Sequence, residues 1–471
     1  MLPASLTSPF VIGMASRLVV QVFALAQIMI ASRYLGLAEF GSYALAWAVA
    51  SIFHAFIFTG FYHIFLRSRT PDEDRDTIFG IMLAVALVAA GLMLCVGILI
   101  GDRQALTSHM FLALAAVPLI EAVNAWNEAH LLREARMRTA NVITGVAEVS
   151  ATAALIAGLL GGIGPLSLVL ARYAANGLKL ILSSSVVRRM PRPGLDIDVL
   201  RRGAHTALSL WVTSGSAMLV NYGGDLILGA FLSPSVVGAY RGGARISQTA
   251  SDLVQQPLTM LSWSRFSRLE KVGHRRQIGL YWRVNVAFGT AAGWPLLICV
   301  ALLSEELVAV VLDETWLPAA VVISIMSVGR AMRLISTQLE PTLTNFDQQK
   351  LLVKIRLFGF ALVGLALLFY GRYGAEHAAT AHLMAALVMA AISIVVTQRV
   401  LALTAREMML TFVPAITLTA LCAAFVWMTQ PLRAGPDPAD GFFLTLSGLF
   451  LLWCGGVALA LSKRVLRWPI P

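Results

Sequence analysis

Apolar segments recur from one end of this sequence to the other, and they are the feature that most restricts its fold. Each is long enough to cross the roughly 30 Å hydrocarbon core of a bilayer as a helix. Only 13% of the residues are charged, about half the share usual in soluble proteins. Because the backbone must satisfy its own polar groups within lipid, and no strand alternation is present, helices are expected. The sequence therefore predicts an all-α integral membrane protein.

The apolar segments divide into about fourteen predicted transmembrane helices. The first is expected to be a retained helix and not a signal peptide, because it lacks a basic leading region and is as long as a spanning helix. The expected helices begin near Pro9, Gly41, Thr77, Thr107, Ala140, Gly164, Ala204, Val236, Trp282, Leu317, Leu352, Ala378, Met409 and Gly441.

The loops between these helices alternate between basic and nearly uncharged. One set, which includes 67–75, 188–202 and 265–276, carries 24 Lys and Arg residues, and the other set carries four. Cytoplasmic loops of membrane proteins are enriched in Lys and Arg, so the basic set is expected in the cytoplasm. An even number of spans agrees with this, so both termini of a multi-pass membrane protein are expected there.

No loop exceeds about 20 residues, so none can hold a soluble catalytic domain, and no nucleotide-binding, nucleophile-elbow or metalloprotease motif occurs. The four cysteines lie in apolar stretches without metal-ligand spacing. The net charge of +11 comes from residues at helix ends, which argues against nucleic acid as a partner. We therefore expect neither a catalytic residue nor a metal or other cofactor.

Two segments of the sequence indicate an internal repeat. Gly41 and Tyr43 align with Gly238 and Tyr240 at an offset of 197 residues, and a weaker match pairs Glu128 with Glu340. An even number of spans separates the copies, so they are parallel repeats related by an axis along the membrane normal. The expected organisation is a six-helix bundle (1–190), a cytoplasmic linker (191–203), a second six-helix bundle (204–402), and two further helices with a short cytoplasmic tail (403–471).

Three stretches resemble the Wzx oligosaccharide flippases, in the polysaccharide-transport branch of the MOP superfamily. They are "ASRYLGLAEFGSYALA" (31–46), "GGDLILGAFLSPSVVGAYRGGARI" (223–246) and "QPLTMLSWSRFSRL" (256–269). The second includes Asp225, at a place where the family also has an aspartate. Arg241 departs from the family pattern, since small apolar residues are commoner at that position. The resemblance implies a transporter of lipid-linked sugar.

Polar side chains form stripes at helical spacing on several expected spans, which puts each stripe on one helix face. Such faces are expected to line a watery cavity or to pair with one another. The stripes comprise Arg17 and Gln21; Glu121, Asn124 and Glu128; Arg172, Asn176 and Lys179; Ser214, Asn221 and Asp225; Arg241, Arg245, Gln248, Asp252 and Gln255; and Ser327, Arg330, Arg333, Thr337 and Glu340.

Two interpretations of these charges stay open. In the first, cations and acids pair with one another and hold helices together. In the second, cations of both halves line a cavity and bind the pyrophosphate of a lipid-linked sugar, which the planar fork of arginine suits. The candidate binding cations are Arg17, Arg172, Lys179, Arg241, Arg245, Arg330 and Arg333. The candidate coupling or pairing acids are Glu121, Glu148, Asp225, Asp252 and Glu340.

The residues and the resemblance together favour a non-enzymatic flippase for undecaprenyl-pyrophosphate-linked oligosaccharide of O-antigen, capsule or exopolysaccharide, working by alternating access. Its expected partners are that lipid, membrane lipids, and a polysaccharide polymerase and chain-length regulator. The alternatives are another transporter of the superfamily, for a peptidoglycan precursor or for drugs, and an integral-membrane polymerase or transferase.

Overall fold

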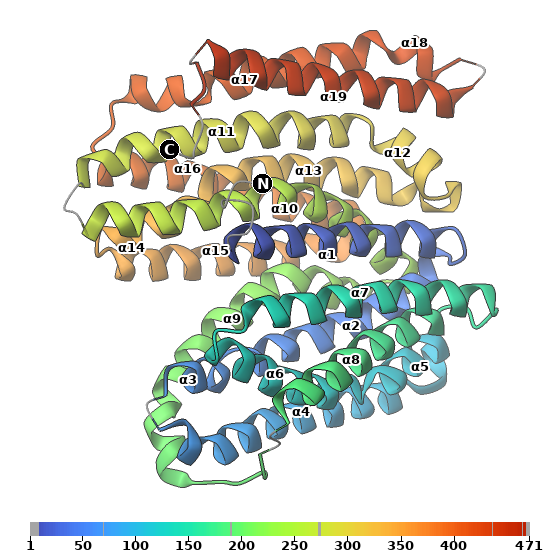
Figure 1. Ribbon diagram of the computed structural model, residues 1–471. Coiled ribbons are helices and arrows are strands. Elements are labelled where there is room, and N and C mark those ends of the chain that lie inside the picture. Colours follow the sequence, from blue (N-terminus) through green and yellow to red (C-terminus); the bar gives the residue numbers. More distant parts are fainter. Residues whose placement is uncertain are drawn as a thin grey trace, which may run out of the picture. The chain divides into compact units, whose positions relative to one another are not determined.

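The computed structural model describes residues 9–68, 70–188, 191–271, 275–435, 437–463 and 465–467. Within these ranges it leaves out the side chains of 9–19, 72, 102, 260–261, 263–265, 267–271 and 275–276. Every regular element in these ranges is a helix (Figure 1). The helices of the first half are α1 (Pro9–Ser32), α2 (Leu37–Ile57), α3 (Phe61–Arg67), α4 (Pro71–Ile100), α5 (Ala105–Leu114), α6 (Val117–Arg133), α7 (Met137–Leu160), α8 (Leu166–Val187) and α9 (Ile197–Phe231). Those of the second half are α10 (Pro234–Lys271), α11 (Arg275–Leu302), α12 (Ser304–Val311), α13 (Pro318–Ser336), α14 (Leu339–Asn345), α15 (Gln349–Tyr370), α16 (Ala375–Val400), α17 (Ala405–Met428), α18 (Gln430–Arg433) and α19 (Pro438–Ser462).

Several expected spans are broken into two helices by local sequence. Between α2 and α3, Gly60 adopts a φ of +56°, a conformation open to glycine. Pro118 follows the break between α5 and α6, and Pro341 follows the break between α13 and α14. When the pieces of each broken helix are taken together, the described chain forms about fourteen long rods, which confirms the predicted all-α architecture.

Eleven of the described rods are long and apolar enough to cross a membrane. They are α2–α3, α4, α5–α6, α7, α8, α11, α13–α14, α15, α16, α17 and α19. The helices α9 and α10 have the length but carry charged residues along their course, among them Asp225 and Arg241. A count based on apolar length alone therefore leaves α9 and α10 out, although both are long enough to span.

Large apolar side chains cover the outside of several rods. Leu99 of α4, Phe369 of α15 and Leu451 of α19 are 76%, 69% and 71% exposed. Exposed apolar surface of this extent is unfavourable in water and is what a lipid-facing helix presents. The protein is therefore a multi-pass membrane protein.

By its internal contacts the chain divides into two compact units, up to Arg241 and from Gly242. The boundary falls inside α10. The segment 191–203, expected to be a linker, already contains the start of α9, because the Asp196 side chain accepts hydrogen bonds from the amides of Asp198 and Val199. The expected division into two six-helix repeats and a C-terminal pair stays a prediction, since a packing unit and a sequence repeat are different properties.

In the first unit, the starts of α2 and α10 cross at two glycines. A Cβ atom on Gly41 would lie 1.8 Å from the carbonyl oxygen of Pro234, and one on Gly238 would lie 2.0 Å from that of Leu37. The two contacts are reciprocal, because Leu37 and Pro234 are separated by the same 197 residues as the two glycines. The segments matched as a repeat in the sequence thus pack directly on each other.

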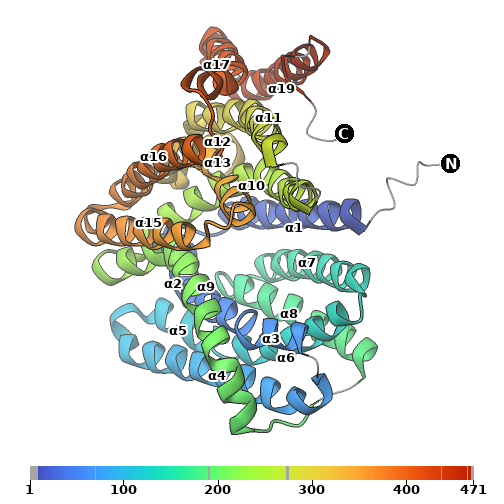
Figure 2. The same cartoon turned by 90° about the vertical axis from the view of Figure 1, so that its left-hand side faces the viewer.

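Within each unit, a few pairs of helices make most of the packing contacts. In the first unit α7 lies against α8 and α1, and α6 against α8 (Figures 1 and 2). In the second unit α13 packs against α11 and α16, and α11 against α17. The indole of Trp294 on α11 donates to the carbonyl of Ala331 on α13 at 2.9 Å, and Ser327 on α13 donates to Ser247 on α10 at 3.0 Å. These bonds hold α13, the helix of Arg330 and Arg333, within the second unit.

Candidate functional site

In the first unit, Arg172 of α8 is held over an aromatic platform on α2. Its Nε donates to the hydroxyl of buried Tyr43 at 2.9 Å, and its guanidinium lies 4.4 Å from the centroid of the Trp47 ring. The rings of Tyr43 and Trp47 are parallel within 6°. Glu148 of α7 acts electrostatically on Arg172 and accepts a hydrogen bond from Gln27 of α1 at 3.4 Å. The Nη groups of Arg172 have no hydrogen-bond partner among the described residues.

Asp225 and Arg241 form a buried ion pair at 3.2 Å, between α9 and α10. The Asp225 side chain is 0% exposed and that of Arg241 11%. Arg241 also donates to the carbonyl of Asn221 and lies 3.9 Å from the centroid of the Tyr222 ring. Two charges in this environment compensate each other, so this pair supports the first interpretation of the stripes.

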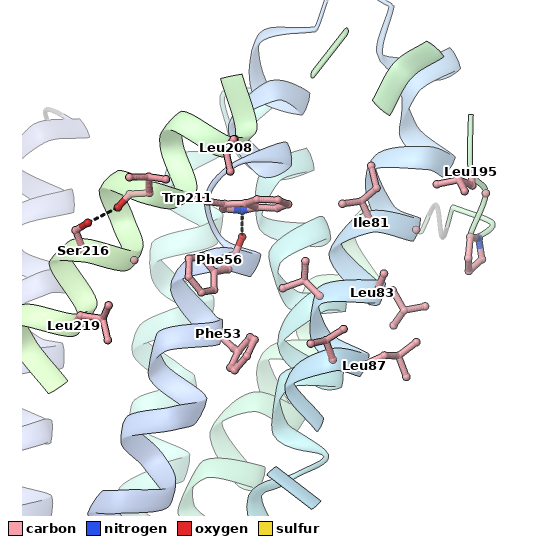
Figure 3. A pocket seen from close by; sticks show the side chains of 18 residues that line it. Phe53, Phe56, Ile81, Leu83, Leu87, Leu195, Leu208, Trp211, Ser216 and Leu219 are labelled. Atoms are coloured by element: carbon pink, nitrogen blue, oxygen red, sulfur yellow. Dashed lines mark hydrogen bonds between the residues drawn. The ribbon is translucent and has the colours of Figure 1, made fainter. Parts of the chain in front are cut away.

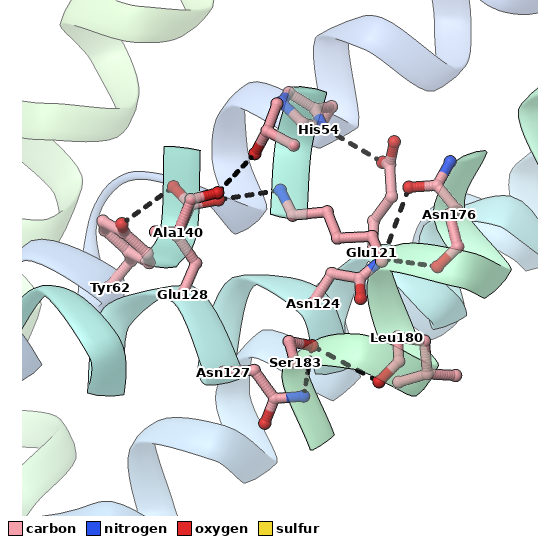
Figure 4. A network of polar contacts seen from close by, with 12 residues as sticks. His54, Tyr62, Glu121, Asn124, Asn127, Glu128, Ala140, Asn176, Leu180 and Ser183 are labelled. Carbon is pink, nitrogen blue, oxygen red and sulfur yellow. Dashed lines mark hydrogen bonds and ion pairs between the residues drawn. The ribbon is translucent and has the colours of Figure 1, made fainter. Parts of the chain in front are cut away.

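A second polar network of the first unit joins α2, α3, α6 and α8 (Figure 4). Lys179 donates to Glu128 at 2.7 Å, and the hydroxyl of Tyr62 lies 3.3 Å from the other oxygen of that carboxylate. His54 of α2 lies 3.2 Å from buried Glu121. Lys179 and Glu128 therefore neutralise each other, and Glu121 has a histidine partner that the sequence alone does not indicate.

The hydrogen bond of Asn124 to the backbone carbonyl of Asn176, at 3.0 Å, ties α6 to α8. Together with the pair of Lys179 and Glu128 it places the polar stripes of these two helices face to face. The two stripes thus satisfy each other, as the pairing interpretation expects.

In the second unit, Asp252 of α10 is the centre of a basic cluster. Its carboxylate interacts electrostatically with Arg245 of the same helix and with Arg330 and Arg333 of α13. Arg330 is buried. The cations that the sequence placed on two separate stripes are therefore gathered around one acid.

His382 of α16 is part of the same cluster, because both Arg330 and Arg333 act on it electrostatically. It is a residue that reasoning from the sequence missed. A histidine in the middle of an apolar helix was the available signal, but its position opposite α13 depends on how α13 and α16 pack.

Glu340 lies apart from the described cluster. It forms an ion pair with Arg356 of α15, and both side chains are more than two-fifths exposed. The matched residue Glu128 instead pairs with Lys179, so the two glutamates aligned in the sequence have different kinds of partner. The side chain of Arg17 lies outside the described residues.

A family model with the description "Polysaccharide biosynthesis protein" matches residues 30–321 of this sequence. The chain belongs to the family of polysaccharide biosynthesis proteins. All three stretches behind the resemblance to oligosaccharide flippases lie within the matched range, and this resemblance is confirmed. Arg330 and Arg333 lie just beyond the end of the match.

Solved transporters share the fold of this family member. The lipid II flippase MurJ, in an inward closed conformation, is 9% identical and superimposes with a TM-score of 0.72, covering 96% of this chain and 99% of its own. An inward-facing multidrug resistance transporter of the MATE family, in the MOP superfamily, is 12% identical with a TM-score of 0.59, covering 81% and 94%. No curated protein matches this sequence. At these identities the likeness establishes the fold alone, which this chain shares with the two transporters.

Among the described residues, no three His, Cys, Asp or Glu side chains gather in a group that could hold a metal ion. The interior charges form a cluster of arginines around Asp252 and pairs of a basic residue with a carboxylate. Such clusters can bind an anion or hold helices together, and the binding roles of the individual residues stay predictions.

Proposed function

We propose that this protein is a flippase that carries polyprenyl-pyrophosphate-linked oligosaccharide from the cytoplasmic to the periplasmic face of a bacterial inner membrane. Both termini are cytoplasmic in this proposal. Membership of the polysaccharide biosynthesis family and the MOP-transporter fold support it. No covalent step is required, because alternating exposure of a binding site to the two faces is enough for translocation.

The observation that carries the proposal is the geometry of Arg172. Tyr43 fixes the guanidinium at Nε and Trp47 fixes its plane, while both Nη groups have no hydrogen-bond partner in the part of the chain described. A guanidinium held in this way presents two parallel N–H donors to a pair of phosphate oxygens. The cluster around Asp252 supplies further cations, Arg330 and Arg333, in the second unit.

Each polar group has a distinct role in this mechanism. Arg172, Arg330 and Arg333 offset the loss of hydration when the pyrophosphate enters the hydrocarbon region. Asp225 and Arg241 neutralise each other and hold α9 against α10. Asp252 limits the positive charge of the second cluster when no substrate is bound, since it interacts with three arginines.

The test measures surface polysaccharide and lipid-linked intermediates in cells that express variants at equal protein level. Arg330→Ala and Arg333→Ala are expected to abolish surface polysaccharide and to cause the lipid-linked oligosaccharide to accumulate. The matched control is Arg399→Ala, an arginine in the last turn of α16 outside the cluster. Normal polysaccharide with both cluster variants would exclude the phosphate-binding role.

A second candidate substrate is lipid II, because the flippase named for it has a similar fold over nearly the whole chain. The two substrates are separated by the lipid that accumulates when the protein is removed from cells. Accumulation of a peptidoglycan precursor, with lysis, would favour lipid II. An integral-membrane polymerase is separated by incubating purified protein with lipid-linked sugar, whose chain length a flippase leaves unchanged.

A further inference from the structure

The first unit contains a large apolar groove outside the charged clusters, with a volume of about 1010 Å³ (Figure 3). We call it the α2–α4–α9 groove. It is lined by side chains that include Phe53 and Phe56 of α2, Ile81 and Leu87 of α4, and Leu208 and Trp211 of α9. Its volume is at the upper end of the range for ligand sites in proteins.

The polar groups of the groove wall are already satisfied. The indole Nε1 of Trp211 donates to the carbonyl of Phe56 at 2.9 Å, and the hydroxyl of Ser216 donates to the carbonyl of Val212 at 2.7 Å. The wall therefore presents carbon atoms to an occupant. Leu87 and Leu208 are 56% and 60% exposed, so the groove presents apolar surface to its surroundings. Hydrocarbon is the chemistry that such a wall accepts.

One helix face links the groove to a cationic end. The groove residues Leu208, Val212 and Leu219 follow one another on α9 at spacings of four and seven. The same face continues toward the start of the helix with Arg201, seven residues before Leu208, and with His205. This face of α9 is therefore polar near the start of the helix and apolar further along, an arrangement that matches the polar headgroup and apolar chain of a lipid.

Two acids of α4 near this end are already engaged, while Glu73 of α4 and Asp198 of α9 are exposed. Asp74 accepts from Ser68 at 2.6 Å and lies 3.5 Å from Arg202. Asp76 accepts from the amide of Arg192 at 3.2 Å and lies 3.4 Å from the guanidinium of Arg75. Arg75 thus pairs with Asp76, and Arg202 with Asp74.

Arg192 and Arg201 are two further basic residues at this end of the groove. Both side chains are exposed, and neither has a charged partner within the described residues. Arg192 directly precedes Pro193 and Gly194, which line the groove. The end of the groove therefore carries two exposed guanidinium groups that form no ion pair with a described carboxylate.

We propose that the α2–α4–α9 groove binds a resident anionic phospholipid, with an acyl chain in the groove and its phosphate at Arg192 and Arg201. The basic loops that adjoin this end are predicted to be cytoplasmic, and the cytoplasmic leaflet is the one that carries anionic lipid. The proposal does not depend on which sugar the protein carries. The acyl chain would cover the apolar walls that α2, α4 and α9 form around the groove.

The polyprenyl tail of a transported lipid fits the groove less well. Its pyrophosphate must cross the bilayer, whereas the groove carries cations at one end and only satisfied polar groups along its wall. A lipid whose headgroup stays in one leaflet matches that distribution of charge.

The test uses full-length protein in nanodiscs and the fluorescence of Trp211. Phosphatidylglycerol or phosphatidylcholine with a dibrominated acyl chain is added as a quencher, and the signal of Trp211 is taken as the difference between wild type and Trp211→Phe. We expect stronger quenching by brominated phosphatidylglycerol than by brominated phosphatidylcholine. Equal quenching by the two lipids would mean that only bulk lipid reaches the groove, and would overturn the proposal.

Three variants test the two ends of the site separately. Ala84→Phe, which fills the groove from α4, is expected to remove the quenching, and Ala153→Phe on the exposed face of α7 is its control. Arg201→Gln is expected to weaken the preference for phosphatidylglycerol about fivefold, and Arg138→Gln, at another basic loop, to leave it unchanged. Unchanged quenching in Ala84→Phe would contradict the proposal. So would displacement of the brominated lipid by an equimolar amount of undecaprenyl phosphate, which would assign the groove to the transported lipid.

Failure of this proposal and failure of the proposed function are distinguishable. Loss of the phosphatidylglycerol preference is measured by fluorescence without any transport, and the Arg330 and Arg333 variants are measured by surface polysaccharide. A protein that lacks the lipid site can still flip, and a protein that does not flip can still hold the lipid.

Discussion

Gly41 of α2 and Gly238 of α10 meet back to back, each with its missing side chain directed at the backbone of the other helix. The two residues are also the equivalent positions of the sequence repeat. When matched segments contact each other, each contact occurs twice, so the same position must be small in both segments. This explains why a glycine stands at both of the matched positions.

Substitution of either glycine is expected to destabilise the protein. A Cβ atom at Gly41 would lie 1.8 Å from backbone, which cannot rotate away, so Gly41→Ala should cost about 1–3 kcal/mol or more. Gly91→Ala on α4 is the control, because nothing lies within 4 Å of the added atom and alanine favours the helix. The midpoint of thermal unfolding in detergent measures both. An unchanged midpoint for Gly41→Ala would contradict the close crossing.

The hydrogen bond between Tyr43 and Arg172 is expected to matter for transport. Tyr43→Phe removes the acceptor that fixes the guanidinium, and a hydrogen bond to a charged group contributes about 1.5–3 kcal/mol, so transport per molecule should fall at least about tenfold. Arg172→Lys should also lower transport, because lysine keeps the charge but lacks the planar fork of arginine.

A matched control for Tyr43→Phe is Tyr173→Phe. Tyr173 follows Arg172 on α8, and its hydroxyl donates a hydrogen bond to the carbonyl of Ala113 on α5, which the variant removes. This variant is expected to lower protein level at most, with transport per molecule unchanged. Equal loss in both tyrosine variants would show that the effect is structural and not a matter of phosphate binding.

The buried pair of Asp225 and Arg241 is expected to be strongly coupled. Asp225→Asn leaves Arg241 buried without its counter-charge and should cost about 3–5 kcal/mol of unfolding free energy. Combining Asp225→Asn with Arg241→Gln removes both charges and should recover much of that loss. A double-mutant cycle on the unfolding midpoint measures the coupling, and additive effects would mean that the pair does not stabilise the crossing of α9 and α10.

The exposed pair of Glu340 and Arg356 is expected to contribute little. Both groups are more than two-fifths exposed, and ion pairs in such surroundings contribute about 0–1 kcal/mol. Glu340→Gln should therefore leave the unfolding midpoint nearly unchanged and should not alter transport. A loss of transport as large as that of Arg333→Ala would place Glu340 with the basic cluster after all.

The sequence by itself determined the class of structure, the number of rods and the family. Apolar length and loop charge are properties of contiguous residues, so each span can be recognised without knowledge of its neighbours. The family resemblance rested on 31–46, 223–246 and 256–269, and it held because these motifs build local features such as the start of α10.

The tertiary structure decided which charges meet. The stripes place polar residues on shared helix faces, but a face has many possible partners. Its partner depends on how the helices rotate and pack. For that reason Glu121 is found with His54, Asp225 with Arg241, and His382 beside Arg330, while Glu340 turns to Arg356. The α2–α4–α9 groove has the same origin, since three helices distant in the sequence form its walls. A charge in lipid requires compensation, and packing alone decides whether a neighbouring side chain or a substrate supplies it.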